Sequence, residues 1–139
     1  VSGGNMRVNG TIKSVDRMPY LALLELSETN VPLLNFVAVQ SSEEISLPLV
    51  QIGSKVRLEC FIQFGVVTNT SPVEFDLYVT QLGKNATTKG RAKVISRVND
   101  YEYVICPLNS VTITLELEEG ASLNDGQIIE FTGELSNET

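Results

Sequence analysis

Apolar and polar residues alternate along much of this chain with the two-residue period of β-strands. In Val111–Leu117 every second residue is aliphatic, and the residues between them are two threonines and a glutamate. The segment Val56–Ile62 places Val56, Leu58 and two further apolar side chains on one face. Val73–Val79 shows the same alternation. Each of these segments is therefore predicted to form a strand with one buried face.

Turn-forming residues separate the alternating segments, for example Pro19, Thr29-Asn30 and Asn99-Asp100. No long window has a helical period, and the one short helix candidate, 41–50, contains Pro48. We therefore predict an all-β protein. The expected strands are 6–17, 20–27, 34–40, 54–65, 73–82, 90–98, 101–108, 111–118 and 127–135.

The two halves of the chain resemble copies of one pattern. Gly10–Met18 (GTIKSVDRM) is matched eighty residues later by Gly90–Val98 (GRAKVISRV). Each half continues with a tyrosine-bearing apolar run and later has a glycine followed by a strand. Such a repeat predicts two related structural units. We expect the first at 6–83, a polar linker at 84–89, and a shorter second unit of the same pattern at 90–139.

Composition is that of a globular protein, with 42% hydrophobic and 19% charged residues in a chain of 139. The net charge is −7, with six basic against eight acidic residues in 1–86 and four against nine in 87–139. This charge disfavours non-specific binding of nucleic acid by the whole chain. No apolar run reaches the roughly 18–20 residues of a membrane span, and no signal peptide is visible. We expect no membrane contact, and a nuclear or cytoplasmic location over a secreted one.

Residues suited to catalysis are scarce. The chain has no histidine, and its two cysteines, Cys60 and Cys106, are far apart in the sequence and are expected to be buried thiols. No nucleophile elbow, phosphate loop or zinc-protease motif occurs. We predict a protein without catalytic residues, cofactor or metal. A weak calcium site is the one alternative, with oxygen ligands from Glu118, Glu119, Asn124 and Asp125.

Two segments in which a glycine precedes an alternating strand carry a family resemblance. They are Ile52–Ile62 (IGSKVRLECFI) and Asp125–Leu135 (DGQIIEFTGEL). Both resemble the strand that enters the second half of the barrel in OB-fold proteins of the replication protein A and telomere end-binding type. The resemblance implies tandem small OB-like antiparallel barrels. The second would be incomplete, because the sequence shows five strands in the first unit and four in the second. It could borrow a strand, close differently or be truncated, and an open edge would favour oligomerisation.

The same resemblance implies a binding function, because OB barrels hold single strands with basic grooves and stacking aromatic rings. Single-stranded nucleic acid is one expected ligand, and Tyr20 and Phe36 are further stacking candidates. A partner protein is the expected main ligand, because acidic OB domains often bind protein. The protein would be a subunit or fragment of a DNA replication, repair or telomere complex. The residues predicted to contact nucleic acid are Lys13, Arg17, Lys55, Arg57, Phe61 and Tyr78.

Two alternatives remain open. Arg57–Cys60 resembles strand B of an immunoglobulin-like domain and Asp100–Cys106 resembles strand F, which would make this an extracellular adhesion or receptor domain with a Cys60–Cys106 disulfide. The chain departs from that family because it has no tryptophan and its tyrosine stands three residues before the cysteine. The four N-x-S/T sequences fit an extracellular chain. The other alternative is a β-rich structural module of a virion or tail.

Overall fold

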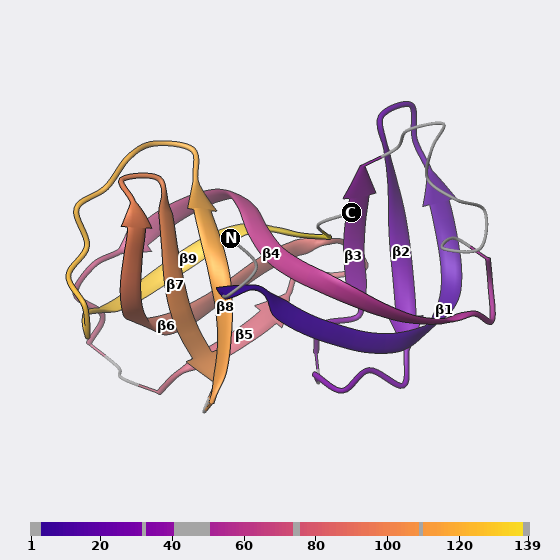
Figure 1. Cartoon of the computed structure of the whole chain (residues 1–139), viewed down its shortest axis with the longest axis horizontal. Helices are drawn as coiled ribbons and strands as arrows, with labels where there is room; N and C mark the ends of the chain where they lie inside the picture. Colours follow the sequence, from indigo (N-terminus) through magenta and orange to yellow (C-terminus); the bar gives the residue numbers. More distant parts are fainter. Residues whose placement is uncertain (1–3, 32, 41–50, 74–75, 109, 138–139) are drawn as a thin grey trace.

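The computed structural model describes residues 4–31, 33–40, 51–73, 76–108 and 110–137, and these residues form an all-β structure. They include no helix that is long and apolar enough to cross a membrane. Figure 1 shows the strands arranged in two groups, with β4 running through both. The strands are β1 (Met6–Arg17), β2 (Leu21–Ser27), β3 (Phe36–Gln40), β4 (Lys55–Asn69), β5 (Tyr78–Gln81), β6 (Thr87–Asn99), β7 (Glu102–Leu108), β8 (Val111–Leu117) and β9 (Ile128–Asn137).

The nine strands occupy the nine segments in which the alternation predicts them, so the all-β prediction is confirmed. The largest difference is at 73–82, where β5 is limited to Tyr78–Gln81. Val73 was expected inside, but its side chain is 92% exposed. Val79, on the same predicted face, is buried, so the prediction was wrong for Val73 because Val73 lies before the strand and not because the wrong face was chosen. The helix candidate at 41–50 lies outside the described residues.

The nine-stranded sheet closes on itself through two circuits of paired strands. The first circuit runs β1-β2-β3-β9-β4 and returns to β1, and the second runs β6-β7-β8-β4-β9 and returns to β6. Each circuit has five strands and one strand pair that is parallel, β3–β9 in the first and β4–β8 in the second. The long strands β4 and β9 belong to both circuits and pair with each other from Cys60–Asn137 to Asn69–Glu130.

Equivalent hydrogen bonds relate the two circuits. Gly53 N–H donates to the Ile12 carbonyl at 2.7 Å, and Gly126 N–H donates to the Val94 carbonyl at 2.6 Å. Ile12 is thus the structural counterpart of Val94, and both strands have a register shift directly after these residues. The sequence match of Gly10 with Gly90 is wrong by two residues. The side chains stay on the same faces, because two residues are one strand period.

The segment 84–89, predicted as a linker, does not interrupt the sheet. Thr87–Lys89 belong to β6, and Ala86 and Thr88 are buried. The strand that the second unit lacks in its own sequence is β4, so that gap does not leave the predicted open edge. The strand at the end of the described sheet is the four-residue β5. The division into two units stays a prediction, and the two circuits share strands.

One hydrophobic core cluster spans both circuits. β4 contributes Leu58, Cys60 and Ile62, all of which are fully buried, and β9 contributes Phe131 and Leu135. The predicted inward face of β4 is thereby confirmed. The two strands that belong to both circuits thus contribute to this one core cluster.

Candidate functional site

A β-bulge in the middle of β4 interrupts the alternation of that strand. The pairing of β4 with β9 shifts register between Gln63 and Val66. Phe64, at the bulge, has a left-handed backbone with a φ of 53°. Continued alternation after Ile62 would place Phe64 in the core, but its side chain is 60% exposed. A bulky residue in this conformation costs about 1–3 kcal/mol.

Two glycines allow β4 to lie close to β8 and to β9 at the bulge. A Cβ on Gly65 would lie 2.7 Å from the Glu116 carbonyl oxygen. A Cβ on Gly133 would lie 2.4 Å from Ile62 Cγ2 and 2.9 Å from the carbonyl oxygen of Gln63. Real Cβ atoms do not make such short contacts, so the close approach of β4 to β8 requires glycine at 65, and the close approach of β9 to β4 requires glycine at 133. The packing of β4 against its neighbours at the bulge therefore depends on these two glycines.

The exposed Phe64 lies in a cavity of about 310 Å³, which we call the aromatic groove. Tyr20, just before β2, is 85% exposed and lines the same cavity, and Phe61 of β4 is half-buried there. Three aromatic rings thus gather where β3, β9 and β4 meet. The described residues that line the groove are Tyr20, Leu21, Ala38, Val39, Phe61, Gln63, Phe64, Glu134, Ser136 and Asn137.

Polar groups of β4 and β9 contribute to the lining of the aromatic groove. Gln63 Nε2 donates to Glu134 Oε1 at 2.8 Å, and Ser136 Oγ donates to the Ala38 carbonyl at 3.2 Å. Ser136 and Asn137 are buried. Among the described lining residues Glu134 is the single carboxylate, and no lysine or arginine lines the groove with it. The groove therefore combines aromatic walls with one negative charge.

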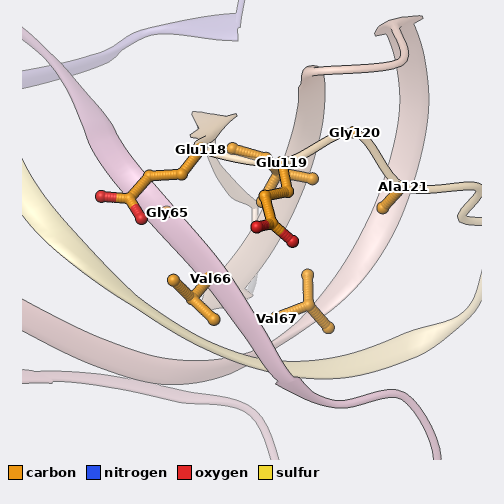
Figure 2. Close-up of a pocket in the computed structure, with 8 residues that line it drawn as sticks. Gly65, Val66, Val67, Glu118, Glu119, Gly120 and Ala121 are labelled. Carbon is orange, nitrogen blue, oxygen red and sulfur yellow. The ribbon is translucent and has the colours of Figure 1, made fainter.

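A second cavity, the acidic pocket, lies on the other side of the bulge. Its volume is about 330 Å³, and Figure 2 shows the side chains of Glu118 and Glu119 beside the valines of β4. The N–H of Glu118 donates to the Gly65 carbonyl at 3.0 Å. Within the described part of the chain no three histidine, cysteine, aspartate or glutamate side chains are grouped to hold a metal ion. The calcium alternative at Glu118, Glu119, Asn124 and Asp125 therefore gains no support.

A third cavity, the basic pocket, brings together two of the residues predicted to contact nucleic acid. Lys55 and Arg57 line it on β4, with Asn9, Gly10 and Thr11 of β1 and with Glu28 and Val56. Lys55 lies opposite Thr11 and Arg57 opposite Asn9 in the pairing of these strands. The volume is about 430 Å³. Glu28 places a carboxylate among the cations, which weakens the attraction for a phosphate.

The other predicted contact residues are not collected at one site. Lys13 forms an ion pair with Glu25 at 3.5 Å, and Arg17 is exposed at the end of β1. Phe61 lies in the aromatic groove. Tyr78 is covered by the Arg91 guanidinium, 5.1 Å from the ring centre. Its ring is thus used within the protein. Phe36 is half-buried and does not line the groove.

Both cysteines are free thiols. Cys60 is buried, and burial raises the pKa of its thiol to about 12. Cys106 is half-buried, and its Sγ donates to the Leu108 carbonyl at 2.8 Å. The expectation of thiols is confirmed, fully buried for Cys60 and partly for Cys106. The disulfide required by the immunoglobulin-like alternative is not formed.

No family model, curated protein or solved structure matches this chain. The candidate site is therefore defined by the geometry of the described residues. Sequence reasoning placed Phe61 at a binding surface and named Tyr20 as a stacking candidate, but it missed Phe64. The signal was present, because Gly65 follows Phe64 directly inside a strand, and such a glycine often marks a bulge.

Proposed function

We propose that this protein is a non-catalytic binding module and that its main ligand is a partner protein held in the aromatic groove. The observation that carries the proposal is Phe64, which combines an unfavourable φ of 53° with a ring that is 60% exposed. Strained residues that persist in a fold are concentrated at functional sites. Clustered exposed apolar side chains mark interaction surfaces. A partner that covers the ring would turn this exposure into binding free energy.

The strand pairing supports an OB-like interpretation of the fold. The first circuit contains the successive strands β1 to β4 and is closed by β9, which is parallel to the third of them, β3. The second contains the successive strands β6 to β9 and is closed by β4, which is parallel to the third of them, β8. A five-stranded Greek-key barrel is the architecture of OB domains. We propose two OB-like barrels, each closed by a long strand that also serves the other. Such a protein would act within a DNA replication, repair or telomere complex, as the resemblance implies.

Charge favours a protein ligand over single-stranded DNA in the groove. The one charged group among the described lining residues is the carboxylate of Glu134, and the whole chain carries −7. Phosphates would be repelled by both. An apolar side chain of a protein can contact Tyr20, Phe61 and Phe64 without this penalty. Aromatic side chains are also enriched at the centres of protein interfaces.

The ionisation of the described residues fits binding without chemistry. Two groups have a clearly shifted pKa: Cys60, raised to about 12, and Arg97, raised by its hydrogen bond to Asp100. A thiol with so high a pKa is protonated near pH 7 and is a poor nucleophile. An arginine with a raised pKa stays charged. Neither group is tuned to exchange protons near neutral pH, as a general acid or base would be.

Single-stranded DNA is the second candidate ligand, favoured by the outward face of β4. Phe61, Arg57 and Lys55 alternate on that face, so a strand that stacks on Phe61 could extend towards the two cations. Anisotropy with a mixed-sequence oligonucleotide at about 50 and 200 mM salt tests this. Binding that weakens with salt and is lost in the Arg57→Ala, Phe61→Ala double variant would establish it. Equal binding by the variant would exclude this face.

The main proposal can be tested with a displayed library of random peptides and the full chain as bait. We expect the chain to enrich peptides whose binding is lost in the Tyr20→Ala, Phe64→Ala double variant. Tyr101→Ala is the matched control, because Tyr101 is an exposed tyrosine outside the groove. Peptides that bind the double variant as well as they bind the control would contradict the proposal, and so would a library without enrichment. The virion or tail alternative predicts the latter.

A further inference from the structure

We infer that the aromatic groove recognises a basic residue, best an arginine, next to an apolar anchor in an extended segment of the partner. The inference rests on the proposed function of the groove and specifies the chemistry of its ligand. It follows from the pairing of glutamates on the sheet and from an arginine site elsewhere in the same fold.

Besides Glu134, Glu102 and Glu116, the described strands hold three glutamates, and each of these three pairs with a cation. Glu25 pairs with Lys13 at 3.5 Å, Glu59 with Arg7 at 2.9 Å, and Glu130 with Arg91 at 3.5 Å. In the part of the chain that the structure describes, Glu134 forms no ion pair, and its carboxylate accepts a hydrogen bond from the neutral amide of Gln63 at 2.8 Å. Glu134 is also only partly exposed. A half-buried carboxylate without a cation attracts one strongly.

The chain contains an example of the arrangement that we infer. Arg91 lies over the Tyr78 ring at 5.1 Å from its centre and reaches the Glu130 carboxylate at 3.5 Å. Glu130 and Glu134 are four residues apart on β9, and β-strand residues at even spacing lie on one face. The groove contains the same two kinds of group, because Tyr20, Phe64 and Glu134 all line it. The missing member of the set is the guanidinium, which a partner would supply.

Arginine suits this position better than lysine. Its planar guanidinium can stack on an aromatic face while it donates two hydrogen bonds to a carboxylate. Leu21, Ala38 and Val39 provide an apolar wall beside the aromatic rings. A volume of about 310 Å³ is at the lower end for ligand pockets, which suits one anchoring side chain with its basic neighbour.

The peptides enriched by the full chain test the inference. We expect an arginine or lysine within two positions of an aromatic or aliphatic residue. For a synthetic peptide of this type, anisotropy should show about tenfold weaker binding by Glu134→Gln, the loss of one charge-assisted contact. The control Glu118→Gln removes the same charge from the acidic pocket and should bind unchanged. Replacing the peptide arginine by glutamine should have little further effect on Glu134→Gln, because the two changes remove one interaction.

Failure of the inference differs from failure of the proposed function. Peptides that depend on Tyr20 and Phe64 but lack a basic residue, or that bind Glu134→Gln as well as wild type, would overturn the inference and leave the groove as a protein-binding site. Additive effects of Glu134→Gln and the peptide change would also overturn it. Binding that is indifferent to Tyr20 and Phe64 would overturn both. Thermal unfolding of Glu134→Gln establishes that the variant is folded, since glutamine keeps an acceptor for Gln63.

Discussion

Two tyrosines begin corresponding hairpins of the two circuits, and their surroundings differ. Tyr101 precedes β7 and is 55% exposed. The end of β8 and the segment after it lie beside Tyr101, because Leu117 N–H donates to the Tyr101 carbonyl at 2.7 Å and Ala121 N–H donates to the Asp100 carbonyl at 2.9 Å. Tyr20 precedes β2, is 85% exposed and lines the aromatic groove. Corresponding positions in the two circuits therefore differ, because Tyr101 is partly covered and Tyr20 is open to solvent.

The two cavities next to the bulge differ in the chemistry of the residues that line them. Gln63 and Phe64 line the aromatic groove, and the next residues, Gly65 to Val67, line the acidic pocket. The change of side occurs within one strand, at the bulge. The lesson is that a local irregularity in a shared strand can separate two surfaces of different chemistry. The following predictions test whether the bulge and its neighbours cause this difference.

The largest effect is expected from Gly133→Val, which would remove the close crossing of β4 and β9. Its Cβ alone would lie 2.4 Å from Ile62 Cγ2, so both strands would have to move apart. We expect a loss of about 3 kcal/mol in the free energy of unfolding, measured with urea. Gly120→Ala is the control, because its Cβ would make an ordinary contact at 3.5 Å with the Tyr101 ring. Equal stability of the two variants would show that the strands do not cross this closely.

A smaller loss in the free energy of unfolding is expected from Tyr103→Phe, which tests whether the Tyr103 hydroxyl holds the segment after β8 in place. The buried hydroxyl of Tyr103 donates to the Ala121 carbonyl at 2.5 Å and accepts from Leu123 N–H at 3.1 Å. Its removal should cost about 1–3 kcal/mol and raise hydrogen exchange at residues 119–123. Tyr101→Phe should change neither quantity. Unchanged exchange in Tyr103→Phe would show that this hydroxyl does not hold the segment.

Phe64→Asn should separate stability from binding. Asparagine tolerates the left-handed conformation better than phenylalanine, and the exposed ring contributes little burial. We expect the free energy of unfolding to stay within about 1 kcal/mol of wild type or to rise, while binding of the groove peptides is lost. The control Phe61→Asn should lose stability, because Phe61 is half-buried in a regular part of β4. A large destabilisation by Phe64→Asn would show that Phe64 is a packing residue.

The smallest effect near neutral pH concerns Cys60. Burial raises the pKa of this thiol to about 12 in the folded protein, above the ordinary thiol value of 9.0 that applies when the chain is unfolded, so the unfolded chain loses the proton first as pH rises. This contribution to stability is complete below pH 9 and is lost between pH 9 and about 12. Cys60→Ala should therefore show a weaker loss of stability over this range than Cys106→Ala. The same slope for both variants would contradict the burial of the Cys60 thiol.

The strands could be predicted from the sequence because alternation is a local property, and Val111–Leu117 shows it without interruption. The closure of the sheet could not be predicted, because it depends on strand pairs such as Ala38 with Ser136, which are nearly a hundred residues apart in the sequence. The first unit was expected to close with its own five strands, and a borrowed strand was one of three possibilities for the second; in the structure β9 completes the first circuit and β4 completes the second. The prediction that Val73 is buried was wrong because β5 begins only at Tyr78, whereas Val79 on the same predicted face is buried.

The candidate site was predictable only in part. Phe61 follows from the alternation of β4, whose odd-numbered residues face outward. Phe64 has the opposite parity and reaches the same groove because the bulge turns the strand. The four basic residues were predicted from their positive charge and their shared strand faces, and the structure pairs Lys13 with Glu25 and groups only Lys55 with Arg57. Charge on a strand face does not reveal which acidic side chain lies across the sheet.

The most direct test of this account is an NMR map of backbone amide shifts while the full chain is titrated with one enriched peptide. We predict that the perturbed amides cluster at Leu21, Ala38, Phe61–Phe64 and Glu134–Asn137, the elements of the aromatic groove. A cluster at Glu118–Ala121 would place the ligand in the acidic pocket, and a cluster at Lys55–Arg57 would place it in the basic pocket. Either of these results would contradict the central claim that Phe64 and its neighbours form the binding site.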